Sequence, residues 1–312
     1  HSCQDSEVSD IKGEEVMDGK VVRWRNYIAI PLKSDVWRPK TNFKEKTAEL
    51  VKGIVSNGDY VIVSEKALSA ALGRLYDEST IRSDLYSRVM TYLIMKLLWG
   101  AILSRVCRLS QETLRLIRNY PLIDGSRHKK LALRIGGWLQ TLKPTSEAGI
   151  DTTNVPGYLV SLPLEKPFEI AHEIREHIAK TLKVNVRVVI VDSDKCYRFK
   201  PLPKLILTSR KSGIPSSINL GFLSFLIARM LHRLFSPYAT PLGFSPQRMD
   251  LEELLVVSEL ADRARGFGAG RTLYEVEKNL KVKTAKITWE VLNSVPHYPV
   301  VVVKKFKRSR RA

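Results

Sequence analysis

The sequence predicts an α+β fold that combines mixed sheets with helical insertions, and three observations support this prediction. Apolar runs of strand length alternate with helical stretches, but without the regular rhythm of βαβ units. No internal repeat is present along the 312 residues, which are enough to bury a sizeable core. Residues 185–196 contain a continuous apolar run, which is typical of a strand buried on both faces of a sheet.

The first half of the chain contains a strand, helices and a short strand–helix unit. Apolar residues of one parity predict a strand over 20–31. The segment 44–55 has the pattern of a helix, and 57–74 predicts a turn, a short apolar strand and a helix of small residues. Residues 80–118 are expected to be mostly helical, because apolar side chains occur all round and breakers are few.

The second half repeats this mixture. An amphipathic helix is predicted over 167–182, with Pro167 in its first turn. A helix is expected over 221–235, and another begins after Asp250, a plausible N-cap. The apolar segment 299–305 predicts a last strand.

The longest apolar run, 89–106, raises the question of a membrane span. A span needs about 20 mostly apolar residues. Because this run contains Lys96 and ends near Arg105, we interpret it as a buried helix and expect no membrane partner.

The cysteine and histidine patterns predict neither a disulfide framework nor a zinc site. Cys3, Cys107 and Cys196 are scattered, which favours a reducing, cytoplasmic compartment. His172 and His177 are five residues apart, whereas two ligands on one helix face need a spacing of four.

The chain is strongly basic, with 51 Lys and Arg against 32 Asp and Glu, a formal net charge of +19. Such an excess favours anionic partners, including nucleic acid and nucleotides. The densest block is 304–312, with six cations in nine residues. This tail is either a solvated end or a sequence-independent clamp on RNA or DNA phosphates.

Two acidic clusters are candidates for metal and phosphate chemistry. Asp151 lies in a predicted turn with Asn154 three residues later, and Asp192 and Ser193 follow a predicted buried strand. Mg²⁺ prefers such oxygen ligands. The same residues are also common turn caps, and spacing alone leaves both interpretations open. The glycine-rich segment 265–272 is similarly either a phosphate cradle or a helix end.

Several segments resemble the coenzyme F-420 gamma-glutamyl ligase family. The clearest are "AGIDTTNVPG" (148–157) and "VIVDSDKCYR" (189–198). "GDYVIVSEKALSAALGR" (58–74) resembles the family's nucleotide segment, "IAIPL" (28–32) its Pro-containing strand end, and "SELADRA" (258–264) its late helix. The resemblance is consistent with a divergent member of archaeal type and implies the family's α+β fold.

The resemblance implies a ligase that forms homodimers. It would use GTP and two divalent cations, Mg²⁺ or Mn²⁺, to add glutamate to a phosphate-bearing acceptor through an acyl phosphate. Asp151 and Asp192 would be catalytic and, with Ser193, would hold metal. The implied nucleotide-binding residues are Pro31, Leu32, Glu65, Lys66, Asn154, Gly268, Gly270 and Arg271.

The sequence departs from the family pattern at the nucleotide half of the site. Ala70 replaces a phosphate-contacting Lys, and Lys66, one helical turn earlier, is the candidate substitute. The family's late metal and nucleotide loop has no counterpart after 258–264. The alternative function is therefore a non-catalytic or altered-substrate homologue that binds nucleic acid through its basic surface. We expect an N-terminus of 1–20 without fixed structure, a ligase-like domain over 21–303 with a helical insertion near 80–140, and the tail.

Overall fold

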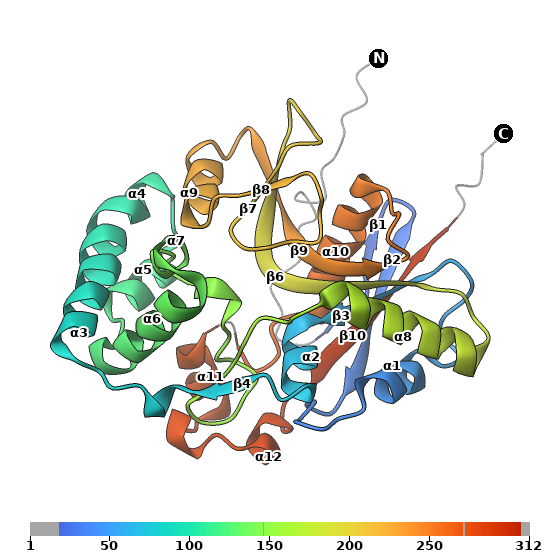
Figure 1. The fold of residues 1–312 in the computed structure, drawn as a ribbon, viewed down its shortest axis with the longest axis horizontal. Coiled ribbons are helices and arrows are strands. Elements are labelled where there is room, and N and C mark those ends of the chain that lie inside the picture. The colour runs from blue at the N-terminus through green and yellow to red at the C-terminus, as the bar shows by residue number, and fades with distance from the viewer. Residues whose placement is uncertain (1–18, 146, 271, 307–312) are drawn as a thin grey trace.

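A computed structural model describes residues 19–145, 147–270 and 272–306 of the chain. Its core is a mixed sheet with strand order β1-β2-β10-β3-β6-β7-β8, and β9 pairs with the free edge of β6. The pairing of β3 with β6 is parallel, whereas β10 lies antiparallel to both β2 and β3. The predicted α+β class is confirmed (Figure 1).

The strands of this sheet have the following bounds: β1 Val22–Trp24, β2 Tyr27–Ser34, β3 Tyr60–Ser64, β6 Arg187–Phe199, β7 Ile206–Thr208, β8 Ser217–Asn219, β9 Phe235–Ser245 and β10 His297–Lys305. The predicted strand 20–31 is thus a hairpin of β1 and β2, with Arg25 in the left-handed region at its turn. The predicted tail 304–312 begins inside β10, where Lys304 and Lys305 bind Asp59 and Glu253. Residues 307–312 and most of the predicted N-terminus 1–20 lie outside the described residues.

Helices cover both faces of the sheet. Alternate residues of β3 point to opposite sides: Tyr60 and Ile62 pack against α10 (Leu251–Arg265), and Val61 and Val63 pack against the other layer. That second layer consists of α1 (Phe43–Val51), α2 (Glu65–Ala71) and α8 (Pro167–Leu182). The prediction that the run in β6 is buried on both faces is confirmed.

A helical cluster stands beside the sheet, at the left of Figure 1. Its members are α3 (Leu85–Thr91), the π-helical η3 (Tyr92–Leu103), α4 (Ser104–Val106), α5 (Gln111–Arg118), α6 (Leu122–Gly136) and α7 (Trp138–Thr141). They enclose a separate core around Trp99, Met95 and Ile117, to which α9 (Phe222–Met230) contributes Phe225. By length and composition, Leu85–Val106 is the one described helix able to cross a membrane, and 39% of its most apolar window is buried.

Short elements complete the chain. β4 (Leu75–Asp77) pairs with β5 (Leu159–Ser161) in a small second sheet, flanked by η2 (Glu78–Thr80) and η4 (Glu147–Gly149). After α10, the segment without a family counterpart forms α11 (Leu273–Leu280), η5 (Thr284–Lys286) and α12 (Trp289–Leu292) around their own apolar cluster. The Gly157 amide donates to the Ile287 carbonyl, so this segment packs on the loop that contains Asp151.

Candidate active site

The parallel pair of β3 and β6 places two carboxylates side by side. Ser64 is opposite Val191 in the last pair of the ladder, and Glu65 and Asp192 follow directly. Ligands commonly bind at the carboxyl ends of parallel strands, because there the chain leaves the sheet and side chains face open space. The parallel ladder therefore ends where the acidic residues begin.

The strand itself does not end at Asp192, which corrects the sequence-based expectation. β6 continues to Phe199, and its register against β9 shifts: Asp192 is opposite Thr240 and Lys195 is opposite Ala239. Ser193 and Asp194 are therefore extra residues in a β-bulge, a feature that redirects side chains. The bulge allows three consecutive residues, Asp192 to Asp194, to line one cleft.

This cleft is narrow and bordered by polar groups. Its free volume is about 30 Å³, room for water-sized occupants in this conformation. The lining residues come from α2, the loop before β5, β5 itself and the bulge; they are Glu65, Lys66, Ser69, Gly149, Ile150, Asp151, Ser161, Leu162, Asp192, Ser193 and Asp194. The structure thus brings together five of the predicted site residues, whose roles stay predictions: Glu65, Lys66, Asp151, Asp192 and Ser193.

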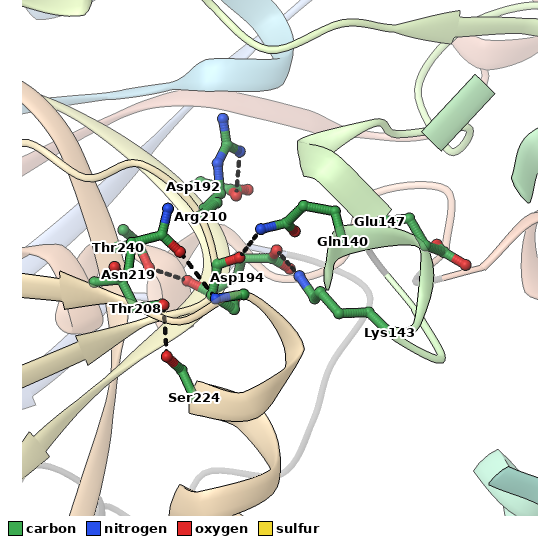
Figure 2. A network of polar contacts seen from close by, with 12 residues as sticks. Gln140, Lys143, Glu147, Asp192, Asp194, Thr208, Arg210, Asn219, Ser224 and Thr240 are labelled. Atoms are coloured by element: carbon green, nitrogen blue, oxygen red, sulfur yellow. Dashed lines mark hydrogen bonds and ion pairs between the residues drawn. The ribbon is translucent and has the colours of Figure 1, made fainter. Parts of the chain in front are cut away.

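Arg210 joins the carboxylates of Glu65 and Asp192, and Figure 2 shows its contact with Asp192. Its Nη1 lies 2.6 Å from Asp192 Oδ2 and 2.7 Å from Glu65 Oε2, and its Nη2 lies 2.8 Å from Glu65 Oε1. All three side chains are buried. Burial raises the pKa of Glu65, whereas at Asp192 the nearby Arg210 and Lys66 outweigh burial and lower the pKa. Arg210 is thus the shared counter-ion of the site.

Asp151 has two roles in this structure. Its Oδ1 accepts hydrogen bonds from the backbone amide and hydroxyl of Thr153, both at 2.7 Å, so it caps its own turn. Its Oδ2 forms an ion pair with Lys66, whose pKa is lowered by burial. The turn-cap interpretation and a role in the cleft are therefore compatible.

Two further cations reach the bulge. Lys143 Nζ lies 2.8 Å from Asp194 Oδ2, and the Asp194 carbonyl accepts from Thr240 Oγ1 at 2.6 Å (Figure 2). On the other side, Arg265 Nη2 donates to Ser193 Oγ at 3.1 Å. The predicted metal ligand Ser193 is hence already bonded to a cation from α10.

The cleft has the donor chemistry of a hard-cation site. Glu65, Asp151, Asp192 and Asp194 offer carboxylate oxygens, and Ser69 Oγ is buried in the same cleft without a hydrogen-bond partner. Oxygen-only donors of this kind suit Mg²⁺ or Mn²⁺. In this conformation the described residues contain no group of three acidic, histidine or cysteine side chains arranged as metal ligands, because basic side chains lie between the carboxylates. Metal binding would require Lys66 and Arg210 to release Asp151 and Asp192.

Two other predicted nucleotide-binding residues, Asn154 and Gly268, lie close together outside the cleft. The Asn154 Oδ1 atom is buried without a hydrogen-bond partner, and a Cβ added to Gly268 would be 3.5 Å from it. Asn154 therefore faces the glycine-rich segment rather than the cleft around Asp151. Gly270 packs closely on Glu275 of α11, and Arg271 lies outside the described residues.

Pro31 and Leu32 do not lie at a strand end, contrary to the resemblance. β2 continues to Ser34, and Pro31 and Leu32 are paired with Val301 and Val300 of β10. Leu32 is buried in the core under α1 and α8. Neither residue lines the cleft.

A buried polar cluster anchors the helical cluster to the loop before Asp151. His128 Nδ1 lies 2.6 Å from Glu78 Oε1, and its Nε2 lies 3.2 Å from Glu147 Oε2. Lys129, fully buried, contacts Glu147 at 2.6 Å and donates to the carbonyl of Thr141 at 2.8 Å. Although burial opposes the charged form, the two glutamates raise the pKa of His128 to about 10. The cluster fixes the segment that leads into Gly149.

Sequence reasoning missed Arg210 and Lys143. Arg210 follows β7 with no motif around it, and Lys143 lies two residues after α7, beyond the segment whose pattern departs from the family. Each residue is recognisable only by its distant partner. Buried carboxylates require cations as partners. The sequence therefore indicates that such cations exist, but it does not identify them.

The comparison with known families identifies the class of protein as a ligase family. Residues 31–200, more than half of the chain, match the model of the F420-0:Gamma-glutamyl ligase family. The chain belongs to this family, and the sequence-based resemblance is confirmed.

A full-length relative extends the similarity beyond that span. The chain is 32% identical over 293 residues to the uncharacterized protein MJ1361 of Methanocaldococcus jannaschii, covering 88% of this chain and 96% of that protein. The similarity therefore includes parts outside 31–200, where the family model does not match.

Proposed function

We propose that the chain is a GTP- and divalent-metal-dependent ligase that adds glutamate to a phosphate-bearing acceptor through an acyl phosphate. The supporting observation is the cleft at the end of the parallel β3–β6 pair, where four carboxylates meet Lys66, Arg210 and Lys143. Such a mixture of charges serves both phosphate binding and the retention of cations.

The proposed reaction has two chemical steps. The acceptor carboxylate attacks the γ-phosphorus of GTP, and GDP leaves as an acyl phosphate forms. The amine of glutamate then attacks the acyl carbon, inorganic phosphate leaves, and a proton is lost from nitrogen. In this proposal Lys66, which lines the cleft, binds the anionic phosphoryl group in competition with Asp151.

Asp151 and Asp192 would hold the metal, with Ser193 available when Arg265 releases it. Bound metal would supply neutralisation of the phosphate charge and alignment of the attacking and leaving oxygens.

The position of Lys66 also supports the ligase proposal. Ala70, at the position of the missing family lysine, is buried, whereas Lys66 lines the cleft one turn earlier. Lys66 therefore takes the role of that lysine in our proposal.

The test is Asp192→Asn, assayed for Mn²⁺-dependent GTP binding and turnover. We expect a loss of about 100-fold or more, since an amide is a poor ligand for a hard cation. Asp59→Asn is the matched control, because Asp59 is also buried and ion-paired, to Lys304, at the opposite end of β3. Equal turnover in wild type and Asp192→Asn, with both folded, would refute the assignment.

The net charge of +19 favours a second candidate, nucleic-acid binding without catalysis. This candidate predicts RNA binding with a steep salt dependence that is reduced by deletion of 307–312. RNA binding by a chain that shows no GTP turnover would favour it over the ligase.

The ligase proposal also includes a homodimer and a cytoplasmic location. Cys107 and Cys196 are buried free thiols, which supports a reducing compartment.

A further inference from the structure

The outer face of the helical run Leu85–Val106 is apolar and exposed. Its inner face packs into the core of the helical cluster through Met90, Ile94 and Trp99. The large exposed apolar side chains on this run are Leu85, Tyr86, Val89, Tyr92, Leu93, Leu97, Ile102 and Val106. Apolar patches of this size mark an interaction surface, because water contact with them is unfavourable.

The same face is basic. The run Leu85–Val106 contains Arg88, Lys96 and Arg105 and no acidic residue, and 107–118 adds three arginines against one glutamate. Arg88 and Arg105 are exposed beside the apolar residues. The partner must therefore combine apolar character with negative charge.

The sequence predicted a buried helix without a membrane partner, but only its inner face is buried. We propose that the outer face docks on an anionic lipid membrane surface, with the helix lying in the plane of the interface. A headgroup layer supplies the negative charge, and the acyl boundary beneath it receives the leucines and tyrosines. The helix does not need to cross the bilayer, because its inner face is already part of a protein core.

A second copy of the chain fits this face less well. In a two-fold symmetric dimer the helix would face its own copy, so that Arg88, Lys96 and Arg105 would meet like charges. The run Leu85–Val106 has no acidic residue to compensate this repulsion, so the homodimer of the ligase proposal would use another face.

Co-sedimentation with vesicles tests the proposal. The whole chain is mixed with phosphatidylglycerol or phosphatidylcholine vesicles, and Leu93→Ser/Leu97→Ser is compared with wild type. The substitutions keep the charge and change only exposed side chains, so circular dichroism should be unaltered. We expect binding to phosphatidylglycerol alone, weakened about tenfold or more in the variant. Leu202→Ser/Ile218→Ser, which alters exposed apolar residues near β7 and β8, is the control and should bind like wild type.

Two results would overturn the proposal. Equal binding of the variant and wild type would mean that charge alone attracts the chain to the vesicles. A wild-type dimer in sedimentation velocity that Leu93→Ser/Leu97→Ser dissociates would assign the face to a second copy. The vesicle assay does not depend on GTP or on the cleft, so its outcome is independent of the ligase proposal.

Discussion

The guanidinium of Arg210 lies 2.6 Å from the carboxylate of Asp192, inside the protein. The same group binds Glu65, so one cation balances two buried carboxylates that directly follow the last pair of the parallel β3–β6 ladder. Two carboxylates this close repel each other unless a cation lies between them. The geometry of the cleft therefore depends on Arg210 as long as no other cation is bound.

Replacement of Arg210 by Met should be strongly destabilising. It leaves Glu65 and Asp192 buried without a counter-ion, which typically costs about 3–5 kcal/mol of unfolding free energy. Urea unfolding at pH 7 measures this loss. The loss should shrink at pH 5, because the carboxylates then take up protons more readily.

The triple variant Glu65→Gln/Asp192→Asn/Arg210→Met separates charge from packing. If the loss is electrostatic, removing both carboxylates should restore most of the stability. An equally unstable triple variant would show that Arg210 acts by filling space. Arg38→Met, which breaks an exposed pair with Glu290, is the control and should cost about 1 kcal/mol or less.

The sequence made Asp151 and Asp192 candidates, and the family resemblance added Glu65. The apolar run before Asp192, the short strand before Glu65 and the turn around Asp151 are local patterns, and the structure assembles these three residues. The cations were not predictable in the same way. Arg210 contacts Glu65 across 145 positions, and no local pattern encodes that contact.

The strand β9 shows a second limit of sequence patterns. Its sequence, "FSPYATPLGFS", contains two prolines and a glycine, which favour turns. The strand forms because β9 pairs with β6 only, so its proline nitrogens do not have to donate to a second neighbour. The edge position became known only from the assembled sheet.

Gly149→Ala should disturb Arg210 directly. Gly149 has φ of +74°, and an added Cβ would lie 2.5 Å from the Arg210 guanidinium carbon. Gly53→Ala is the matched control, with φ of +76° and nothing within 4 Å of the added Cβ. The control isolates the left-handed strain of about 1–2 kcal/mol.

The clash at Gly149 should add about 1–3 kcal/mol to this strain. The comparison of the two unfolding free energies is the measurement. Equal losses in the two variants would mean that Arg210 moves aside without a measurable loss of stability. The stability would then not depend on the exact position of Arg210 between Glu65 and Asp192.

The His128 cluster should make stability fall at alkaline pH. The folded pKa of about 10 lies above the ordinary value of 6.5. This stabilisation is therefore complete below about pH 6.5 and is lost as pH rises toward 10, with a slope of up to about 1.4 kcal/mol per pH unit. Unfolding free energies measured from pH 6 to 10 should show that slope in wild type and a smaller one in His128→Gln. His172→Gln is the control, since His172 is exposed on α8. An unchanged slope in His128→Gln would contradict the prediction.

Lys143 and Asp194 should couple the helical cluster to the bulge in β6. Their atoms are 2.8 Å apart, and both side chains are largely shielded from water. In a double-mutant cycle of Lys143→Met and Asp194→Asn, we expect a coupling energy of about 1–3 kcal/mol in unfolding. The exposed pair of Lys44 and Glu173, 3.2 Å apart, is the control and should couple by less than about 1 kcal/mol.

Additive losses of unfolding free energy at Lys143 and Asp194 would mean that the helical cluster and the bulge in β6 are not coupled through this ion pair. The order of the cleft would then depend on Arg210 and Lys66, without a contribution from the helical cluster.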